Sequence, residues 1–403
     1  MTNPVPTARK EISLATWTRT VKRSALQEML IAASRPGIIS LALGLPASEL
    51  FPVSEYERAA GQVLATDPDA LQYGPPSKLL RTQIVSIMAQ RGVTCREEQV
   101  FLTAGAQQGM NLLARLLLES GGQVLTEEMA YTGFQQVIEP FEPRVLTVPT
   151  DLETGIDVDA VETLLRDGAR PAFIYAIPDG HNPLGVSMSA EKRRRLVELA
   201  RRYQTPIMED DAYGFISYRK SATPPMRALD EQWVLYVGSF SKILAPALRV
   251  GWLIVPQELT YKLSILKEAT DIDTSTFTQR TVSAYLETGH QSGHIQMLRR
   301  EYRARRDAML SALAQHFPSE ARWEEPTGGV FIWVELPVGA NTDELLKIAI
   351  ETEQVAFIPG NAFCIGGSHK GINSMRLNFS HCDIERIESG IARLARALKV
   401  VLH

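Results

Sequence analysis

Short apolar runs alternate with amphipathic stretches through the middle of the chain, from about residue 100 to residue 255. The apolar runs predicted as strands cover residues 100–103, 123–126, 172–177, 206–208, 233–237 and 250–255. Between them we expect a turn over 105–109 and helices over 110–119 and 189–203. Strands that alternate with helices are joined by crossover connections, so the pattern predicts a mostly parallel sheet. Ligands of such sheets collect beyond the carboxyl ends of the strands.

The pattern changes after about Thr288, where strands and longer helices suggest a smaller α+β domain. Helices are expected over 297–317, 342–353 and 383–400, and strands over 329–336, 355–358 and 374–379. The first of these helices is rich in arginine, but Glu301 and Asp307 interrupt the run. Mixed charge of this kind favours a solvated helix face over a binding patch.

Composition limits the number of domains, the kinds of partner and the cellular compartment that we expect. A chain of 403 residues is long enough for two domains, and 45% hydrophobic with 22% charged residues is typical of a soluble protein. Its 42 Lys and Arg against 46 Asp and Glu give a net charge of −4, so nucleic acid is not an expected partner. Three separated cysteines lack metal-ligand spacing and favour a reducing compartment. Neither a signal-peptide core nor a bilayer-length apolar run is present, so we expect a cytoplasmic protein without membrane contact.

The segment around Lys242 carries the clearest chemical signal. This lysine follows the apolar run 233–237 and lies near Ser239, Ser241 and Arg249. A lysine at the end of a buried strand is poorly solvated, which lowers its pKa and leaves an amine that can attack a carbonyl. The hydroxyls and the guanidinium suit a phosphate. An imine-forming lysine beside a phosphate site points to pyridoxal 5'-phosphate (PLP), although a surface loop would explain the segment taken alone.

Polar residues also follow the apolar run 206–208. A buried carboxylate that faces the PLP pyridine nitrogen would keep that nitrogen protonated, which PLP requires as an electron sink. We expect Asp210 to take this position and Asp211 to cap the following turn. Tyr213, three residues after Asp210, could donate a hydrogen bond to the ring phenolate.

Four further places complete the candidate site. The turn with Ala106 and Gln107 could present backbone amides to an anion at a helix N-terminus. Asn182 could donate its amide to the phenolate, and Tyr131 could stack on the pyridine ring. Arg376, in the strand-like run 374–379, could clamp a carboxylate through two parallel hydrogen bonds. Taken singly, a simple turn is the better explanation of the 105–109 segment and of Asn182, and core packing is the better explanation of Tyr131. A structural salt bridge is the competing explanation of Arg376.

The order and combination of these motifs resemble the fold-type I PLP-dependent aminotransferases of classes I and II. The similarity is closest to the branch of the 2-aminoadipate and kynurenine aminotransferases and of the enzyme-like domain of MocR-type regulators. It runs from about Ser24 to the C-terminus and includes residues 35–41, 44–46, 50–52 and 71–74. It implies an α/β fold with a large PLP-binding domain (51–290) around a mostly parallel seven-stranded sheet between helices. An N-terminal arm (1–50) would join a smaller α+β domain (291–403).

The resemblance also implies a role for each candidate residue. Lys242 would be the Schiff-base lysine, Asp210 would pair with the pyridine nitrogen, and Asn182 and Tyr213 would contact the ring oxygen. The other cofactor contacts would come from Ala106 (through its backbone), Gln107, Ser239 and Arg249 at the phosphate and from Tyr131 on the ring. Arg376 would bind the substrate α-carboxylate, with Gly44 and Asn182 on the substrate side, and no metal is expected. Tyr73 would reach a neighbour's phosphate, which implies a homodimer with shared active sites.

The chain departs from the family pattern in two segments. The family usually has Gln before the Asn and a small polar residue after the Pro, where this chain has His181 and Leu184. A Gly-Tyr pair is also usual where this chain has Pro75 and Pro76. These changes concern the substrate and the reaction outcome more than PLP binding.

The expected activity is transfer of an amino group from an L-amino acid to a 2-oxo acid, in amino acid metabolism or biosynthesis. Lys242 would move the α-proton, and two half-reactions would give ping-pong kinetics. Two alternatives stay open. The first is side-chain elimination or cyclisation on the same fold. The second is a non-catalytic ligand-sensing domain of the MocR kind, although only about twenty residues precede the family-like segment.

Overall fold

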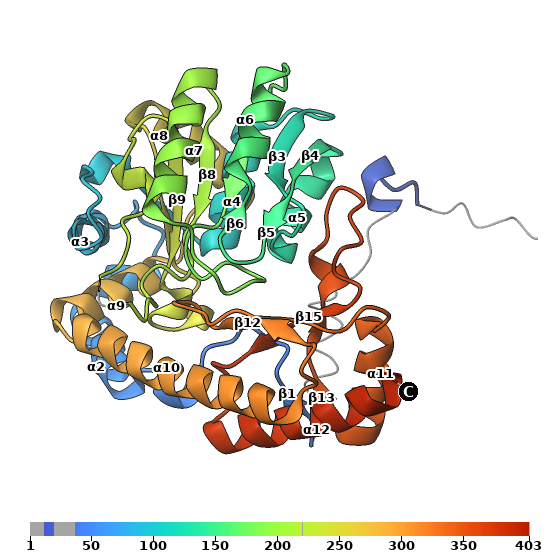
Figure 1. Ribbon diagram of the computed structural model, residues 1–403. Coiled ribbons are helices and arrows are strands. Elements are labelled where there is room, and N and C mark those ends of the chain that lie inside the picture. Colours follow the sequence, from blue (N-terminus) through green and yellow to red (C-terminus); the bar gives the residue numbers. More distant parts are fainter. Residues whose placement is uncertain (1–11, 20–36, 220, 403) are drawn as a thin grey trace, which may run out of the picture.

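The computed structural model describes residues 12–19, 37–219 and 221–402, and it places two sheets one above the other (Figure 1). Parts of the predicted N-terminal arm, residues 1–11 and 20–36, lie outside the described residues. The beginning of the family-like segment, from Ser24 to residue 36, lies outside them as well.

The upper part in Figure 1 is built on a seven-stranded sheet. In spatial order the strands are β2 (Val100–Thr103), β10 (Gly251–Ile254), β9 (Val234–Ser239), β8 (Ile207–Asp210), β7 (Ile174–Ala176), β3 (Gln123–Glu127) and β4 (Arg144–Val148). Of these, β10 runs antiparallel to both its neighbours. The connection from β9 to β10 holds two short 3-10 helices and no crossover helix, so the chain turns back on itself. The predicted mostly parallel sheet is confirmed.

Helices cover both faces of this sheet. The helices around it are α3 (Lys78–Ala89), α4 (Ala106–Leu117), α5 (Thr132–Ile138), α6 (Val158–Arg166), α7 (Ala190–Tyr203) and α8 (Gln257–Asp271). Two further helices, α2 (Val53–Thr66) and α9 (Thr276–Glu287), pack against each other and lie lower in Figure 1. Apolar residues of α4, α5 and α8 pack on one face, and those of α6 and α7 pack on the other. Since strand residues alternate between faces, Ile207 contributes to one core and Met208 to the other.

The turn predicted over 105–109 is shorter than expected, because α4 already begins at Ala106. Gly105 has a φ of +87°, a left-handed conformation that glycine adopts without steric cost. The chain therefore passes from β2 into the helix through only two residues, Ala104 and Gly105, so α4 begins close to the end of the strand.

The lower part contains a four-stranded antiparallel sheet of β11 (Arg322–Trp323), β12 (Phe331–Glu335), β15 (Ser374–Asn378) and β14 (Ile358–Pro359). Its helices are α10 (Gln291–His316), α11 (Thr342–Glu353) and α12 (Ile384–Leu402). The short strand β1 (Ile39–Ser40) pairs in parallel with β13 (Val355–Ala356), so this segment from near the N-terminus lies against the lower part. The α+β character predicted for this region is confirmed, whereas the domain boundaries at 50 and 290 stay predictions.

The arginine-rich helix is not solvated along its whole charged face, so that prediction was wrong for two residues. Arg305 and Arg306 are buried in α10. Arg305 forms an ion pair with Glu49 at 2.8 Å, and Arg306 lies over the Tyr218 ring at 5.2 Å. A buried guanidinium must be paired, and these two join α10 to segments that the local pattern of the helix does not contain.

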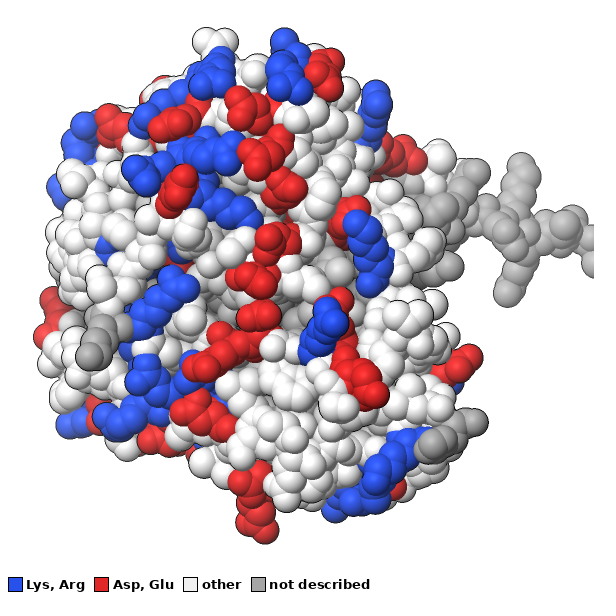
Figure 2. All heavy atoms as spheres, in the orientation of Figure 1, with Lys and Arg blue, Asp and Glu red and all other residues white. Residues whose placement is uncertain are grey.

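Basic and acidic side chains are interleaved on the face in Figure 2. Ion pairs link α7 to α6, for example Arg202 to Glu162. None of the helices in the described ranges has the length and apolarity that a bilayer span requires. The described residues also contain no cluster of His, Cys, Asp and Glu suited to a metal ion.

Candidate active site

A cavity of about 370 Å³ opens beyond the carboxyl ends of β7, β8 and β9. Every residue that the sequence predicted for the site lines it, with the exception of Tyr73: Gly44, Ala106, Gln107, Tyr131, Asn182, Asp210, Tyr213, Ser239, Lys242, Arg249 and Arg376. Parallel strands bring residues far apart in sequence to one edge of the sheet, which explains why strand-end residues meet here.

Lys242 ends the 3-10 helix η7 (Phe240–Lys242), which directly follows β9. Its Nζ donates to the carbonyl oxygen of Gly44 at 2.7 Å. Desolvation inside the cavity lowers the pKa of Lys242 to about 8, and the charges of Arg376 and Arg249 act in the same direction. The lysine is therefore closer to a neutral amine at physiological pH than an exposed lysine would be.

Asp210 ends β8 and has two carboxylate oxygens in different surroundings. Its Oδ2 accepts a hydrogen bond from the Tyr175 hydroxyl at 2.8 Å. Its Oδ1 is buried and has no hydrogen-bond partner among the described residues. Burial raises the pKa of Asp210 to about 6, while the Tyr175 hydrogen bond opposes this rise. A buried oxygen without a partner is costly, so Oδ1 is suited to a cationic donor such as a protonated pyridine nitrogen.

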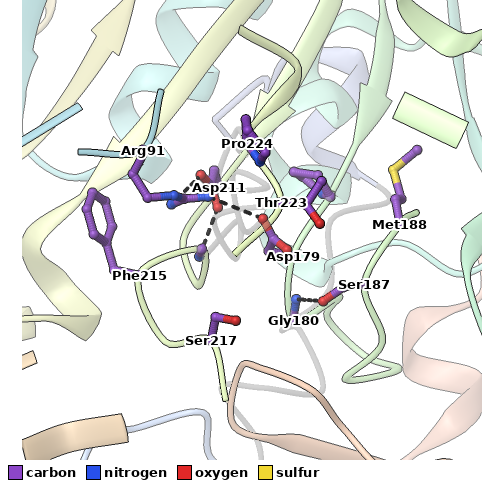
Figure 3. Close-up of polar contacts among 12 residues, drawn as sticks. Arg91, Asp179, Gly180, Ser187, Met188, Asp211, Phe215, Ser217, Thr223 and Pro224 are labelled. Atoms are coloured by element: carbon purple, nitrogen blue, oxygen red, sulfur yellow. Dashed lines mark hydrogen bonds and ion pairs between the residues drawn. The ribbon is translucent and has the colours of Figure 1, made fainter. Parts of the chain in front are cut away.

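Asp211 turns away from the cavity, since successive strand residues point to opposite faces. As predicted, it caps the next turn: its Oδ1 accepts from the Gly214 amide at 2.9 Å. It also pairs with the Arg91 guanidinium at 3.0 Å, and Arg91 contacts Asp179 at 3.3 Å (Figure 3). The buried cluster of Arg91, Asp179 and Asp211 therefore lies on the side of β8 opposite to the Asp210 side chain. No local sequence signal points to it, because Arg91 comes from a distant segment.

Arg376 lies on β15 of the lower sheet, and its guanidinium lies against two aromatic rings. Its centre is 4.2 Å from the Phe331 ring centroid and 4.9 Å from that of Phe363. The guanidinium donates to Asn182 Oδ1 and to the Ala42 carbonyl, each at 2.7 Å. Among the described residues it has no carboxylate partner, so the alternative of a structural salt bridge does not hold. The arrangement leaves its charge for a carboxylate ligand.

One end of the cavity is formed by the start of α4 and by Arg249, next to Gly105. The guanidinium of Arg249 donates from Nη2 to the Ala104 carbonyl at 2.8 Å. It lies so close to Gly105 that a Cβ atom at position 105 would be 2.6 Å from Nη2. The first amides of a helix have no intrahelical acceptor, so this end combines backbone donors with a positive charge. It suits a phosphate group.

Two other predicted phosphate contacts have side chains that are already engaged. Ser239 donates from its Oγ to Ser241 Oγ at 2.9 Å, and both serines line the cavity. Gln107 donates from Nε2 to the Gly133 carbonyl at 2.7 Å. The backbone amide of Gln107, in the first turn of α4, is therefore the group that suits an anion.

Aromatic and aliphatic side chains complete the walls. Phe331 packs edge-on against Tyr213, with ring centroids 5.6 Å apart, and it also supports Arg376. Burial raises the pKa of Tyr213, so its hydroxyl stays protonated and able to donate. The sequence did not single out Phe331, because an apolar residue in a buried strand is indistinguishable from core. Leu43 and Leu45 line the cavity on either side of Gly44.

Two residues at which the chain departs from the family pattern, His181 and Leu184, lie near the cavity but are not part of its lining. His181 is buried and its Nε2 lies 2.9 Å from Glu127 Oε1. Leu184 packs in a separate apolar cluster, and neither residue lines the cavity. Tyr73 is 80% exposed in the single chain.

The model of the family "Aminotransferase class I and II" matches residues 37–394. This chain belongs to that family. The aromatic-amino-acid aminotransferase 1 of Thermococcus litoralis is 37% identical over 389 residues, which cover 94% of this chain and 92% of that protein. The 2-aminoadipate transaminase of Thermus thermophilus is 38% identical over 387 residues and 95% of each chain. The solved α-aminoadipate aminotransferase from Thermus thermophilus, complexed with N-(5'-phosphopyridoxyl)-L-leucine, superposes with a TM-score of 0.90 at 36% identity, covering 96% of this chain and 98% of that one.

The predicted family and fold type are thereby confirmed. The chain is an aminotransferase of PLP fold type I, an enzyme that moves an amino group between an amino acid and a 2-oxo acid with PLP as its cofactor. The expectation that the chain is an enzyme is confirmed with it.

Proposed function

We propose that this cavity is the active site and that Lys242, Asp210 and Arg376 divide the work of transamination. One observation carries the proposal: three groups in one cavity each lack the partner that PLP and an amino acid would supply. Lys242 is an amine with a lowered pKa, Asp210 has an unpartnered buried oxygen, and Arg376 has no carboxylate partner among the described residues.

The other side chains would hold the cofactor. The amides of Ala106 and Gln107, together with Ser239 and Arg249, suit its phosphate. Asn182 accepts from Arg376 through Oδ1, so its amide nitrogen is the end that can donate to the ring oxygen, as the Tyr213 hydroxyl also can. Tyr131 would lie on the ring face. When bound, PLP supplies an electron sink that stabilises negative charge on the substrate α-carbon.

The protein would supply orientation and proton transfer. Arg376 would fix the substrate α-carboxylate, with Gly44 on the same side of the cavity. The Lys242 amine would serve as covalent attachment point and then carry the proton to and from the α-carbon, a task for which a pKa near 8 is well matched. The same groups serve both half-reactions, so the oxo-acid product leaves before the acceptor enters, in a ping-pong scheme.

We further propose that the amino donor has an apolar side chain. Among the described lining residues the cations are Lys242, Arg249 and Arg376, and each already has a role above. The remaining substrate-side wall includes Leu43, Leu45 and Phe331. An acidic side chain would find no cation left for it within this described wall. A donor panel with phenylalanine, leucine and 2-aminoadipate at equal concentration tests this by kcat/KM.

We propose that the working unit is a homodimer with shared active sites, located in the cytoplasm and engaged in amino acid biosynthesis. The side chains of Tyr73 and Leu71 are 80% and 73% exposed to solvent in the single chain. Two large apolar side chains exposed so close together support an interface with a second subunit. Tyr73 would complete the neighbour's phosphate site. Sedimentation velocity of the wild type and of Tyr73→Phe, with PLP affinity measured in parallel, tests the pairing.

The experiment that tests the reaction is a single turnover without an acceptor. Wild-type enzyme loaded with PLP is mixed with each L-amino acid, and 2-oxo acid and ammonia are both quantified. Transamination gives about one oxo acid per site and no ammonia, whereas continued ammonia release would favour elimination or cyclisation. Lys242→Ala should give neither product, while Lys262→Ala, which changes an exposed lysine, should behave as the wild type.

A further inference from the structure

Tyr175 and Asp210 form a buried pair on neighbouring strands. Tyr175 is the central residue of β7 and lies opposite Met208 in β8, so its side chain is on the same sheet face as Met208 and Asp210. Its hydroxyl donates to Asp210 Oδ2 at 2.8 Å, and both side chains are almost fully buried. The tyrosine does not line the cavity, and its hydroxyl is linked to the site by the hydrogen bond to Asp210.

The ring of Tyr175 is itself held in place. It stacks face to face on Phe134, with centroids 3.7 Å apart and planes 1° from parallel. Burial raises the pKa of Tyr175, so the hydroxyl remains protonated and can only donate toward the carboxylate. The donor therefore has a fixed position and a fixed direction.

We infer that Tyr175 is a positioning residue for the cofactor nitrogen: it binds Oδ2 of Asp210 and thereby leaves Oδ1 alone to face the pyridine ring. This inference rests on the role proposed for Asp210. The carboxylate has two oxygens, one with a donor and one buried without any partner among the described residues. Without the hydroxyl, the carboxylate could rotate, and its negative charge would lose its nearest compensating donor.

The same sheet contains a matched control. Tyr236 in β9 lies opposite Glu209, and its hydroxyl donates to Asp211 Oδ2 at 3.0 Å. On the opposite face of the sheet, Tyr236 and Asp211 thus repeat the arrangement of Tyr175 and Asp210. Asp211, however, pairs with Arg91 and does not face the cavity. Replacing Tyr236 with Phe removes an equally buried hydroxyl from an equally buried aspartate. It therefore reports the structural cost of such a change without the effect on the cofactor.

The test compares Tyr175→Phe, Tyr236→Phe, Asp210→Asn and the double variant Tyr175→Phe/Asp210→Asn. Tyr175→Phe keeps the ring and its stacking on Phe134. PLP affinity is measured by titrating cofactor-free protein, and ring protonation is read from the nitrogen NMR signal of ¹⁵N-labelled PLP in the holoenzyme. We expect Tyr175→Phe to weaken PLP binding about tenfold or more and Tyr236→Phe to leave it within about twofold.

The pH dependence provides a second readout. The charged and titratable groups around Asp210 are Asp211 and Tyr213 after β8, His181 after β7, Lys242 after β9 and Tyr131 before α5. All of them are unchanged in Tyr175→Phe. Loss of the hydroxyl raises the pKa of Asp210, so the carboxylate takes a larger share of the ring proton. The ¹⁵N signal should therefore lie closer to the unprotonated value than in the wild type across the neutral pH range. Tyr236→Phe should keep the wild-type profile.

The outcomes separate this inference from the proposal on which it rests. Because Tyr175 acts through Asp210, the double variant should bind PLP no more weakly than Asp210→Asn alone. Equal behaviour of Tyr175→Phe and Tyr236→Phe, or fully additive losses in the double variant, would overturn the positioning role. Wild-type affinity and ring protonation in Asp210→Asn would instead overturn the role of Asp210, and the inference with it.

Discussion

The guanidinium of Arg376 donates from Nη1 to Oδ1 of Asn182 over 2.7 Å. Arg376 lies on β15 of the lower sheet, and Asn182 lies in the segment after β7 of the upper sheet. This bond joins the residue proposed for the substrate carboxylate to one proposed for the cofactor ring. The geometry of the site therefore depends on how the two parts of the chain pack together.

Arg376→Lys should reduce kcat/KM for the amino donor by about 100-fold, mainly through KM. A lysine is a point charge that cannot bind a carboxylate in two parallel hydrogen bonds, and it would also release Asn182. Steady-state kinetics at saturating PLP measure the effect, and Arg300→Lys at an exposed position of α10 is the control. An unchanged KM would argue against the clamp.

Gly105→Ala should weaken PLP binding about tenfold, because the new Cβ atom would lie 2.6 Å from Arg249 Nη2 and displace the guanidinium. Gly121→Ala is the matched control: Gly121 also has a positive φ, of +73°, but a Cβ atom there would meet nothing within 4 Å. Gly105, with φ +87° and ψ 168°, has a backbone conformation that is essentially restricted to glycine, so Gly105→Ala should also lose about 1–3 kcal/mol of stability. Equal PLP affinity in the two variants would contradict the prediction.

The rate at which PLP attaches to cofactor-free enzyme should follow the neutral fraction of Lys242. Since its pKa is lowered from 10.5 to about 8, the rate should fall about tenfold per pH unit below pH 8 and level off above it. Stopped-flow absorbance between pH 6 and about 10 gives the profile. Arg376→Met removes a positive charge and should move the midpoint to higher pH. A wild-type midpoint near that of an ordinary lysine would refute the lowered pKa.

Arg91→Met should lower the free energy of unfolding by about 3–5 kcal/mol, because Asp211 would keep a buried charge without its guanidinium. Urea denaturation of the cofactor-free protein measures this. Arg58→Met breaks the pair with Glu55, in which the arginine side chain is 71% exposed, and should cost less than about 1 kcal/mol. A loss of stability as small as that of Arg58→Met would show that the buried cluster is not needed for stability.

Much of the site could be predicted from the sequence because its residues share a local position. Asp210 and Ser239 end parallel strands, and Asn182 and Lys242 follow such strands closely. The carboxyl ends of parallel strands meet at one edge whatever the details of packing. The mostly parallel sheet could also be predicted, because the alternation of apolar runs and helices is read from the periodicity of each segment alone.

Only the tertiary structure decided which partner each buried polar group has. Tyr175 and Asp210 are 35 residues apart, Asn182 and Arg376 are 194 apart, and Arg305 of α10 pairs with Glu49. Local periodicity indicates that a residue is buried but not what it faces. Strand register and the packing of the two parts determine that, and they arise from the whole chain at once. The sequence by itself therefore determined the class of fold and the chemistry of the strand ends, and the long-range packing decided how that chemistry is held in place.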